Sequence, residues 1–237
     1  MIRAARAPPP AGMAPPAFPI QVCLPMQLHS FFNSSTSYRV RIALALKGIA
    51  YETLPVNIRV LEHRQPHYVA RNPSACVPLL SHDAFELSQS LAIIDYLDAR
   101  HPEPRLIPQD PPQRARVLEL SNVIACDIHP VNNLRVLKYL QAELKVTDAQ
   151  KTAWYRHWIA EGMASVEAML ARQPESPYCF GQAPTLADCC LVPQVANAQR
   201  MGCDLSAFPR ALAVHDHCAQ QPAFRAAAPT AQPDHTA

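Results

Sequence analysis

Four hydroxyl side chains occur together in the stretch FFNSSTSYRVRIALALKGI, just before an apolar pattern of helical spacing. They are Ser34, Ser35, Thr36 and Ser37. The first turn of a helix leaves backbone N–H groups without partners and carries partial positive charge. One serine is enough to cap such a turn, so an ordinary cap with a polar turn is the simpler interpretation. Four hydroxyls add further O–H donors, and the stretch is equally well interpreted as a binding site for an anion such as a thiolate.

Two further segments could supply donors to the same ligand. NPSACVPLL places the Val77-Pro78 bond just before a predicted strand, where a cis peptide would leave the Val77 backbone free to bind. Most X-Pro bonds are trans, so this signal is weak by itself. ELSQSLAII opens another helix at Gln89 and Ser90. Two helix N-termini and one backbone edge suggest a site for a peptide-like ligand with several negative charges.

The elements around these residues alternate at first and then become uniformly helical. Strands are predicted over 27–31, 51–56, 77–80 and 84–87, and helices over 37–47 and 88–100, the second of them capped by Ser88. This order predicts a small mixed sheet with helices packed on it. The proline-rich residues 101–112 are predicted to form a linker. Beyond it, an apolar stripe runs from 117 to 137, and further helices are predicted over 148–172, 185–202 and 209–220.

The chain therefore divides into three parts, and its predicted fold class is α/β followed by all-α. Residues 1–25 are rich in Pro and Ala. We interpret them as a disordered extension, or as the product of a start codon placed too early, with Met26 the natural beginning. Residues 26–106 form the predicted α/β domain, and residues 107–237 the predicted all-helical domain.

The composition argues against several classes of partner. The 237-residue chain has a net charge of +2 and no dense Lys/Arg block, so neither nucleic acid nor an anionic membrane is the expected partner. No apolar run approaches the roughly 20 residues that span a bilayer. The eight cysteines show no CxxC pair and no regular framework, and we expect most of them to be reduced core residues of a cytosolic protein. No metal site is predicted.

Four motifs together resemble the zeta class of glutathione transferases, which comprises the glutathione-dependent maleylacetoacetate and maleylpyruvate isomerases. The motifs are SSTSYRVRIALALKG, QSLAIIDYL, CDIHPVNNLRVLKYL and TLADCCLVPQVANAQR, and they occur in the right order and at the right separations. The similarity extends from Met26 to the end of the chain. It implies a thioredoxin-like domain followed by a helical one, glutathione as cofactor, a small diketo acid as substrate, and a homodimer in the cytoplasm.

The resemblance also assigns roles in the first domain. Ser34, Ser35 and Thr36 correspond to the Ser-Ser-Cys motif of the family and would hold the glutathione thiolate. Threonine replaces cysteine here, but the nucleophile is the sulfur of glutathione, so the replacement does not abolish catalysis. Val77 would pair with the tripeptide backbone, and Gln89 and Ser90 would bind its γ-glutamyl end.

In the helical domain, the resemblance implies ligand contacts for His129 and Asn133 and a substrate-binding role for Arg200. Arg200 and His129 would act as cationic clamps for the two substrate carboxylates. The simpler interpretations are a helix kink at His129-Pro130 and a solvated arginine near a helix end.

One position departs from the pattern of the family, because Asn33 stands where these isomerases commonly carry arginine. If that arginine holds a substrate carboxylate, the charge must come from elsewhere, and Arg39 and Arg41 are nearby in sequence. Thr185 and Asp188 have the spacing of a capping box and are expected to serve folding.

The implied reaction is a cis-to-trans isomerisation, in which the glutathione thiolate adds reversibly to the cis double bond of a maleyl diketo acid. Thr36 and His129 favour conversion of maleylpyruvate to fumarylpyruvate in aromatic (gentisate) catabolism. Maleylacetoacetate, of tyrosine and homogentisate catabolism, is the close alternative. Two other classes stay open, namely a general glutathione transferase or dehalogenase of α-halo acids and a non-catalytic binding protein of the same fold.

Overall fold

A small four-stranded sheet forms the first part of the computed structural model, which describes residues 26–236. The predicted extension, residues 1–25, lies outside the described residues. The strands are β1 Gln27–Ser30, β2 Glu52–Pro55, β3 Leu79–His82 and β4 Phe85–Ser88, in the order β2-β1-β3-β4. β1 and β2 are parallel, whereas β3 is antiparallel to both of its neighbours. The predicted small mixed sheet is therefore confirmed.

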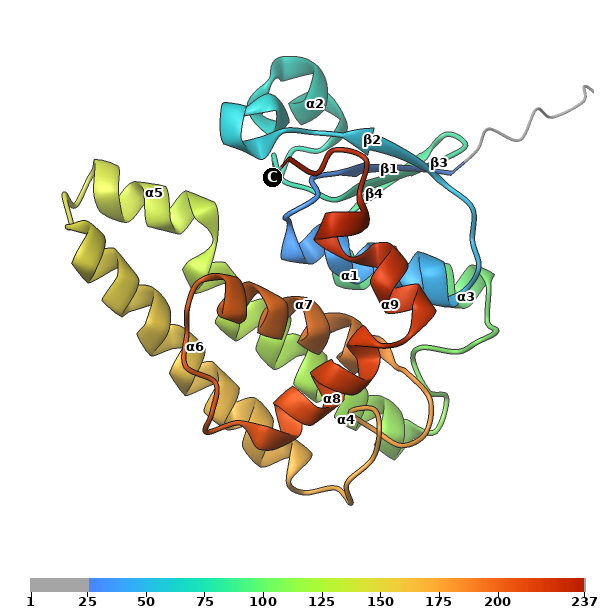
Figure 1. Cartoon of the computed structure of the whole chain (residues 1–237). Coiled ribbons are helices and arrows are strands. Elements are labelled where there is room, and N and C mark those ends of the chain that lie inside the picture. Colours follow the sequence, from blue (N-terminus) through green and yellow to red (C-terminus); the bar gives the residue numbers. More distant parts are fainter. Residues whose placement is uncertain (1–25, 237) are drawn as a thin grey trace, which may run out of the picture.

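Helices cover this sheet and then form the second part of the molecule. In Figure 1, α1 Ser35–Leu46 and α3 Ser90–Arg100 lie below the sheet, and α2 Pro66–Arg71 lies above it. Two short 3-10 turns, η1 Ile58–Val60 and η2 Glu62–Arg64, precede α2. The second part contains α4 Pro111–Asn122, the π-helical η3 Val123–Ile128, η4 Pro130–Asn132, α5 Leu134–Ala142, α6 Asp148–Leu170, α7 Leu186–Arg200 and α8 Pro209–Ala219. The chain ends with α9 Pro222–Ala227 and the short turn η5 Pro229–Ala231.

Helix α1 is the central element of the structure. Ser34 caps it, its hydroxyl accepting a hydrogen bond from the backbone N–H of Ser37 at 3.2 Å. Val40 and Leu44 are fully buried, because α3, α7 and α9 all pack against α1. The helix is followed by Gly48 at φ +62°, a conformation that glycine adopts without strain. The observed helix begins two residues before the predicted start.

Two predictions about the helices are wrong in detail. Ser88 does not cap α3, because it is the last residue of β4 and pairs with Leu79; Gln89 takes the cap position instead. The apolar stripe over 117–137 is not one continuous helix. It passes from α4 into a π-helical turn and then a 3-10 turn at Pro130, whose missing N–H and ring do not fit a continuous α-helix.

The two parts share one hydrophobic core. The predicted linker is held firmly, since the Asp98 carboxylate accepts the backbone N–H groups of Leu106 and Ile107 at 2.7 and 3.2 Å and pairs with Lys47 at 2.8 Å. Leu106 and Ile107 are buried in the same core as α1 and α7. The predicted capping box of Thr185 and Asp188 is also present and buried, which confirms its structural role.

The C-terminal segment returns to the first part of the molecule. In Figure 1 it runs upward from α8 past α1 and ends beside the sheet. The Phe224 and Ala227 carbonyls accept hydrogen bonds from Tyr38 and Arg41 of α1, at 3.4 and 2.9 Å. The Ala/Pro-rich composition of this segment gave no indication of such packing.

The helices of the described residues were also compared with the requirements of a membrane span. None of the helices within residues 26–236 combines the length and the hydropathy that a bilayer crossing requires.

Candidate active site

The hydroxyl cluster forms the turn between β1 and α1, and two of its members bond to one another. The Thr36 hydroxyl donates to the Val77 carbonyl oxygen at 2.9 Å. Ser34 Oγ lies 2.9 Å from Thr36 Oγ1. Because the single hydroxyl hydrogen of Thr36 goes to Val77, Ser34 is the donor to Thr36. Both hydroxyls are thus engaged within the protein, and they fasten the turn to the Val77-Pro78 segment.

Ser35 differs from its two neighbours. Its side chain has no hydrogen-bond partner among residues 26–236, although the residue is only 9% exposed. The backbone N–H groups of Ser35 and Thr36 belong to the first helical turn and likewise have no acceptor in the described chain. One hydroxyl and two amide donors therefore remain available at the positive end of α1, which is the arrangement that stabilises an anion.

The turn is fixed from inside the protein by Arg41. Its fully buried guanidinium donates to the Phe32 carbonyl at 2.9 Å, to Ser30 Oγ at 3.1 Å and to the Phe31 carbonyl at 3.4 Å. Burial lowers the pKa of Arg41 to about 10, which leaves it cationic at neutral pH. Arg41 thus positions the backbone that leads into the hydroxyl cluster.

The same turn is also held by the C-terminal segment. The Asp234 carboxylate accepts the backbone N–H of Phe32 at 2.9 Å, and the His235 ring packs edge-on against the Phe32 ring at 5.2 Å. Asp234 lies 202 residues from Phe32. Sequence reasoning missed this contact, because neither local spacing nor composition indicates it.

Val77 occupies the expected place beside the turn, and the Val77-Pro78 peptide is cis as the sequence suggested. The preceding residue is held by Tyr68 and Asn72, whose side chains donate to the Cys76 carbonyl at 2.8 and 2.6 Å. The Val77 carbonyl is occupied by Thr36, while its N–H has no acceptor among the described residues. The free N–H is the group that could pair with an extended peptide ligand.

Gln89 and Ser90 form the start of α3, as predicted. Gln89 has φ +73°, which is uncommon for a residue with a side chain, and its side chain is exposed. Such backbone conformations concentrate at ligand-binding positions. Ser90 is 5% exposed, and its hydroxyl accepts a hydrogen bond from Arg39 Nη1 at 3.3 Å. Helix α1 thereby connects the two predicted binding turns.

His129 lies at the junction of η3 and η4, where it is largely buried. Burial, and to a lesser extent the positive charges of Arg39 and Arg135, lowers the pKa of His129 to about 3. This low pKa favours a neutral ring, whereas the predicted clamp for a substrate carboxylate requires a protonated one. Its Nε2 lies 3.4 Å from Asn133 Nδ2, and the Asn133 side-chain oxygen caps α5 by accepting the Arg135 N–H. His129 and Asn133, the two residues predicted to contact the ligand, thus contact each other.

Arg200 is the last residue of α7, and its side chain is exposed. It donates to the side-chain oxygen of Asn197, whose amide donates to the Tyr155 hydroxyl at 2.6 Å. No carboxylate among the described residues pairs with it. Its guanidinium is therefore available to an anionic ligand, although no hydrogen bond within residues 26–236 joins it to the hydroxyl cluster.

The missing arginine at Asn33 is not replaced directly by its neighbours. Arg39 and Arg41 are 1% and 0% exposed, so neither guanidinium can meet a substrate carboxylate at the surface. Within the described residues, no group of three or more His, Cys, Asp or Glu is arranged to hold a metal ion.

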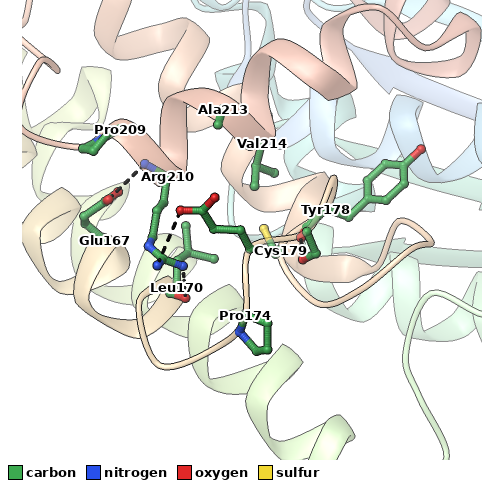
Figure 2. Close-up of a pocket in the computed structure, with 11 residues that line it drawn as sticks. Glu167, Leu170, Pro174, Tyr178, Cys179, Pro209, Arg210, Ala213 and Val214 are labelled. Carbon is green, nitrogen blue, oxygen red and sulfur yellow. Dashed lines mark hydrogen bonds and ion pairs between the residues drawn. The ribbon is translucent and has the colours of Figure 1, made fainter.

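A cavity of about 490 Å³ lies elsewhere, between the end of α6 and the start of α8 (Figure 2). Glu167 accepts the backbone N–H groups of Arg210 and Ala211 there, at 2.9 and 3.0 Å, and so caps α8. The Arg210 guanidinium donates to the carbonyls of Leu170 and Gln173. These polar groups already have partners, and none of the predicted site residues lines the cavity. The candidate site is therefore the surface around the hydroxyl cluster.

Known proteins resemble both parts of the chain. The chain matches the family model of the glutathione S-transferase N-terminal domain over residues 24–99 and that of the C-terminal domain over residues 152–217. A maleylacetoacetate isomerase of Pseudomonas aeruginosa is 47% identical over 212 residues, covering 88% of this chain and 98% of that protein.

Two solved structures are similar over the same extent. A maleylpyruvate isomerase described as a bacterial zeta-class glutathione S-transferase is 45% identical, with a TM-score of 0.87 over 89% of this chain and all of that one. A maleylacetoacetate isomerase of Anaeromyxobacter dehalogenans, solved with glutathione in its active site, is 41% identical, with a TM-score of 0.81 over 90% of this chain and 98% of that one. The chain therefore belongs to the glutathione S-transferase family, and within that family to the zeta class of glutathione-dependent isomerases.

Proposed function

We propose that this protein converts maleylpyruvate to fumarylpyruvate with glutathione as cofactor, as a step of gentisate catabolism. The observation that carries the proposal is the state of the hydroxyl cluster. Ser35 and the first two N–H groups of α1 are held in place but have no partners in the described chain. An active site that must stabilise a thiolate needs donors fixed in advance, because donors already in place need no reorganisation during the reaction.

The residues present fit glutathione along its length. The donors at the start of α1 suit the thiolate, the free N–H of Val77 suits the peptide backbone, and the start of α3 at Gln89 and Ser90 suits the γ-glutamyl carboxylate. Glutathione, when bound, supplies a thiolate that adds reversibly to the cis double bond and so permits rotation about it. The chain lowers the pKa of that thiol through the Ser35 hydroxyl and the α1 amides.

Ser34, Ser35 and Thr36 have different roles in the proposed thiolate site. Ser35 is the direct thiolate donor in this proposal. Ser34 and Thr36 act by holding the turn, because their hydroxyl hydrogens already go to Thr36 and Val77. A donor that is occupied can contribute only by fixing its neighbours.

On the substrate side, Arg200 supplies the positive charge for a carboxylate of the diketo acid. The neutral His129 and Asn133 can offer hydrogen bonds but no charge. These roles are proposals, as are the homodimer and the cytoplasmic location that the resemblance predicts.

The choice of maleylpyruvate rests on Thr36 and His129, which by resemblance favour that branch. The solved maleylpyruvate isomerase supports it at 45% identity, but the maleylacetoacetate isomerase of P. aeruginosa at 47% supports the alternative equally. Maleylacetoacetate is therefore the second candidate substrate.

Ultraviolet absorbance of the two diketo acids provides the test. The purified protein should isomerise maleylpyruvate only when glutathione is present, and with a kcat/KM at least tenfold above that for maleylacetoacetate. The reverse preference would assign the alternative substrate. A rate equal to that of buffer with both acids, together with conjugation of an electrophile such as 1-chloro-2,4-dinitrobenzene, would leave a general transferase.

A further inference from the structure

Arg39 is a buried arginine, and most of its hydrogen-bond donors have no acceptor in the described part of the chain. The residue is 1% exposed, and burial lowers its pKa. Its one hydrogen bond goes from Nη1 to Ser90 Oγ at 3.3 Å. Its Nε and Nη2 have no acceptor among residues 26–236. An unpaired buried cation costs free energy, and proteins seldom retain one without a function.

Arg41 shows what a structural arginine looks like in the same helix. It is equally buried, but its guanidinium makes four hydrogen bonds, three of them to backbone carbonyls of the Phe31-Phe32 turn and of Ala227. The two arginines are only two residues apart in the helix, but they differ in role. Arg41 joins segments of the fold, whereas Arg39 directs its charge toward one serine at the start of α3.

That serine is left with a free donor by the contact. A serine hydroxyl has one hydrogen to donate and two lone pairs to accept. Ser90 Oγ accepts from Arg39, and its own hydrogen has no acceptor in the described chain. Ser90 is also the first residue of α3, where unpaired N–H groups and the helix dipole favour an anion. The hydroxyl and the helix start therefore present donors to the same ligand, with a buried cation behind them.

We propose that Arg39 is a positioning residue that orients the Ser90 hydroxyl toward the α-carboxylate of the γ-glutamyl group and offsets its charge from inside the protein. This rests on the proposed use of glutathione and adds a residue that never touches it. The ligand would see a positive potential without a cation at the surface. Coulombic attraction through the low-dielectric interior is weakened less than attraction through water.

The test is an equilibrium binding measurement that needs no isomerase activity. Isothermal titration calorimetry compares glutathione with 4-aminobutyryl-cysteinylglycine, which is glutathione without that α-carboxylate. Wild-type protein should prefer glutathione by about tenfold, within the range of coupling between interacting groups. Arg39→Met should bind glutathione about tenfold more weakly and bind the analogue as wild type does, losing the preference. Arg39→Lys should restore part of it, because lysine keeps the charge without the planar fork.

Two further variants separate this role from simple loss of stability. Lys47→Met removes another buried cation, at the C-terminal cap of α1, that pairs with Asp98, and should lower the melting temperature while leaving the preference for glutathione unchanged. Ser90→Ala should lose the preference, and Arg39→Met in that background should add less than twofold. If Arg39→Met does not fold, Arg39→Gln, which also lacks the charge, and Ser90→Ala carry the same comparison.

The possible failures are distinct. If wild-type protein binds glutathione and Arg39→Met, or Arg39→Gln in its place, retains the full preference over the analogue, the inference is overturned and the proposed function stands. If wild-type protein binds neither ligand, both are overturned. In steady state, the expected signature is a raised KM for glutathione with kcat at saturation within about twofold of wild type.

Discussion

The two halves of the candidate site are built differently. On the proposed glutathione side, the hydroxyl cluster is nearly buried, and its turn is held by Arg41, by Val77 and by Asp234 of the C-terminal segment. On the proposed diketo acid side, Arg200 is exposed at a helix end, and only a short chain of hydrogen bonds through Asn197 steadies it. The glutathione side is preorganised for one ligand, and the other side leaves room for variation.

This difference explains why the cofactor is easier to infer than the substrate. Rigid, buried groups impose a definite pattern on the sequence, as in the motif SSTSYRVRIALALKG. An exposed arginine can meet a carboxylate of more than one diketo acid, because long side chains adjust at low cost on a surface. The similar isomerases accordingly bear both substrate names at nearly equal identity.

Ser35→Ala should break the preorganised half most severely. Among Ser34, Ser35 and Thr36 it removes the one hydroxyl without a partner in the described chain, so kcat/KM should fall by 100-fold or more, as in removal of a preorganised donor. The ultraviolet titration of bound glutathione should show the pKa of its thiol rising toward the free value. Circular dichroism should show an unchanged fold, since Ser35 bonds to no other side chain in the described chain.

Thr36→Val serves as the matched control for that change. It keeps the shape of the side chain but removes the hydrogen bonds to Ser34 and Val77, so the turn loosens while Ser35 stays. We expect a loss of about tenfold, consistent with one or two neutral hydrogen bonds. A larger loss for Thr36→Val than for Ser35→Ala would reverse the division of roles proposed for the cluster.

Arg200→Leu should weaken the other half alone. Removing the exposed cation should raise the KM of the diketo acid by about tenfold, which is the effect of one charged hydrogen bond. The KM of glutathione should stay within twofold, because no hydrogen bond within residues 26–236 joins Arg200 to the hydroxyl cluster. If both KM values rise together, the two halves are coupled and the contrast between them fails.

Asp234→Ala tests whether the C-terminal segment belongs to the preorganised half. It leaves the Phe32 N–H without its acceptor, so the turn should lose about 1 kcal/mol of stability. We expect kcat to fall severalfold and the KM of the diketo acid to stay constant. His235→Ala keeps Asp234 and removes only the ring contact with Phe32, so its effect should be smaller.

The sequence was sufficient for the local parts of the site. Caps, apolar spacing and the Val77-Pro78 pair predicted helix α1 to within two residues, the strand that follows Pro78 and the capping box of α7. These features depend on neighbours within a few residues, which is why they can be read along the chain. Even there, the start of α3 was displaced by two residues, because pairing of Ser88 in the sheet outweighs its tendency to cap a helix.

The non-local parts could not be predicted in the same way. Asp234 meets Phe32 across 202 residues, and Arg39 meets Ser90 across 51. The family resemblance also implied a charge on His129, which sits in a motif and gives no sign of its burial. Only the fold brings together the burial and the two arginines that lower the pKa of His129. Burial and long-range charge are properties of the folded chain and leave no periodic mark in the sequence.

His129→Gln should have the smallest effect on activity and a clear effect on the pH dependence of stability. The wild-type pKa of His129 is about 3, against about 6.5 in the unfolded chain, so the unfolded state binds more protons between these values. The histidine therefore makes the free energy of unfolding rise with pH across this window and fall as pH drops below 6.5.

The expected difference in slope is up to about 1.4 kcal/mol per pH unit, because one proton is involved. Urea denaturation at pH 5 and pH 8 measures it, and His129→Gln should lose less stability than wild type between the two. His29, whose pKa burial lowers to about 4, keeps part of the slope in both proteins. Since the wild-type ring is already neutral, kcat/KM should change by no more than threefold. A tenfold loss, with disappearance of an acidic limb near pH 6, would instead mean that His129 acts as a cation in the bound state, and the substrate half would then carry a second charge.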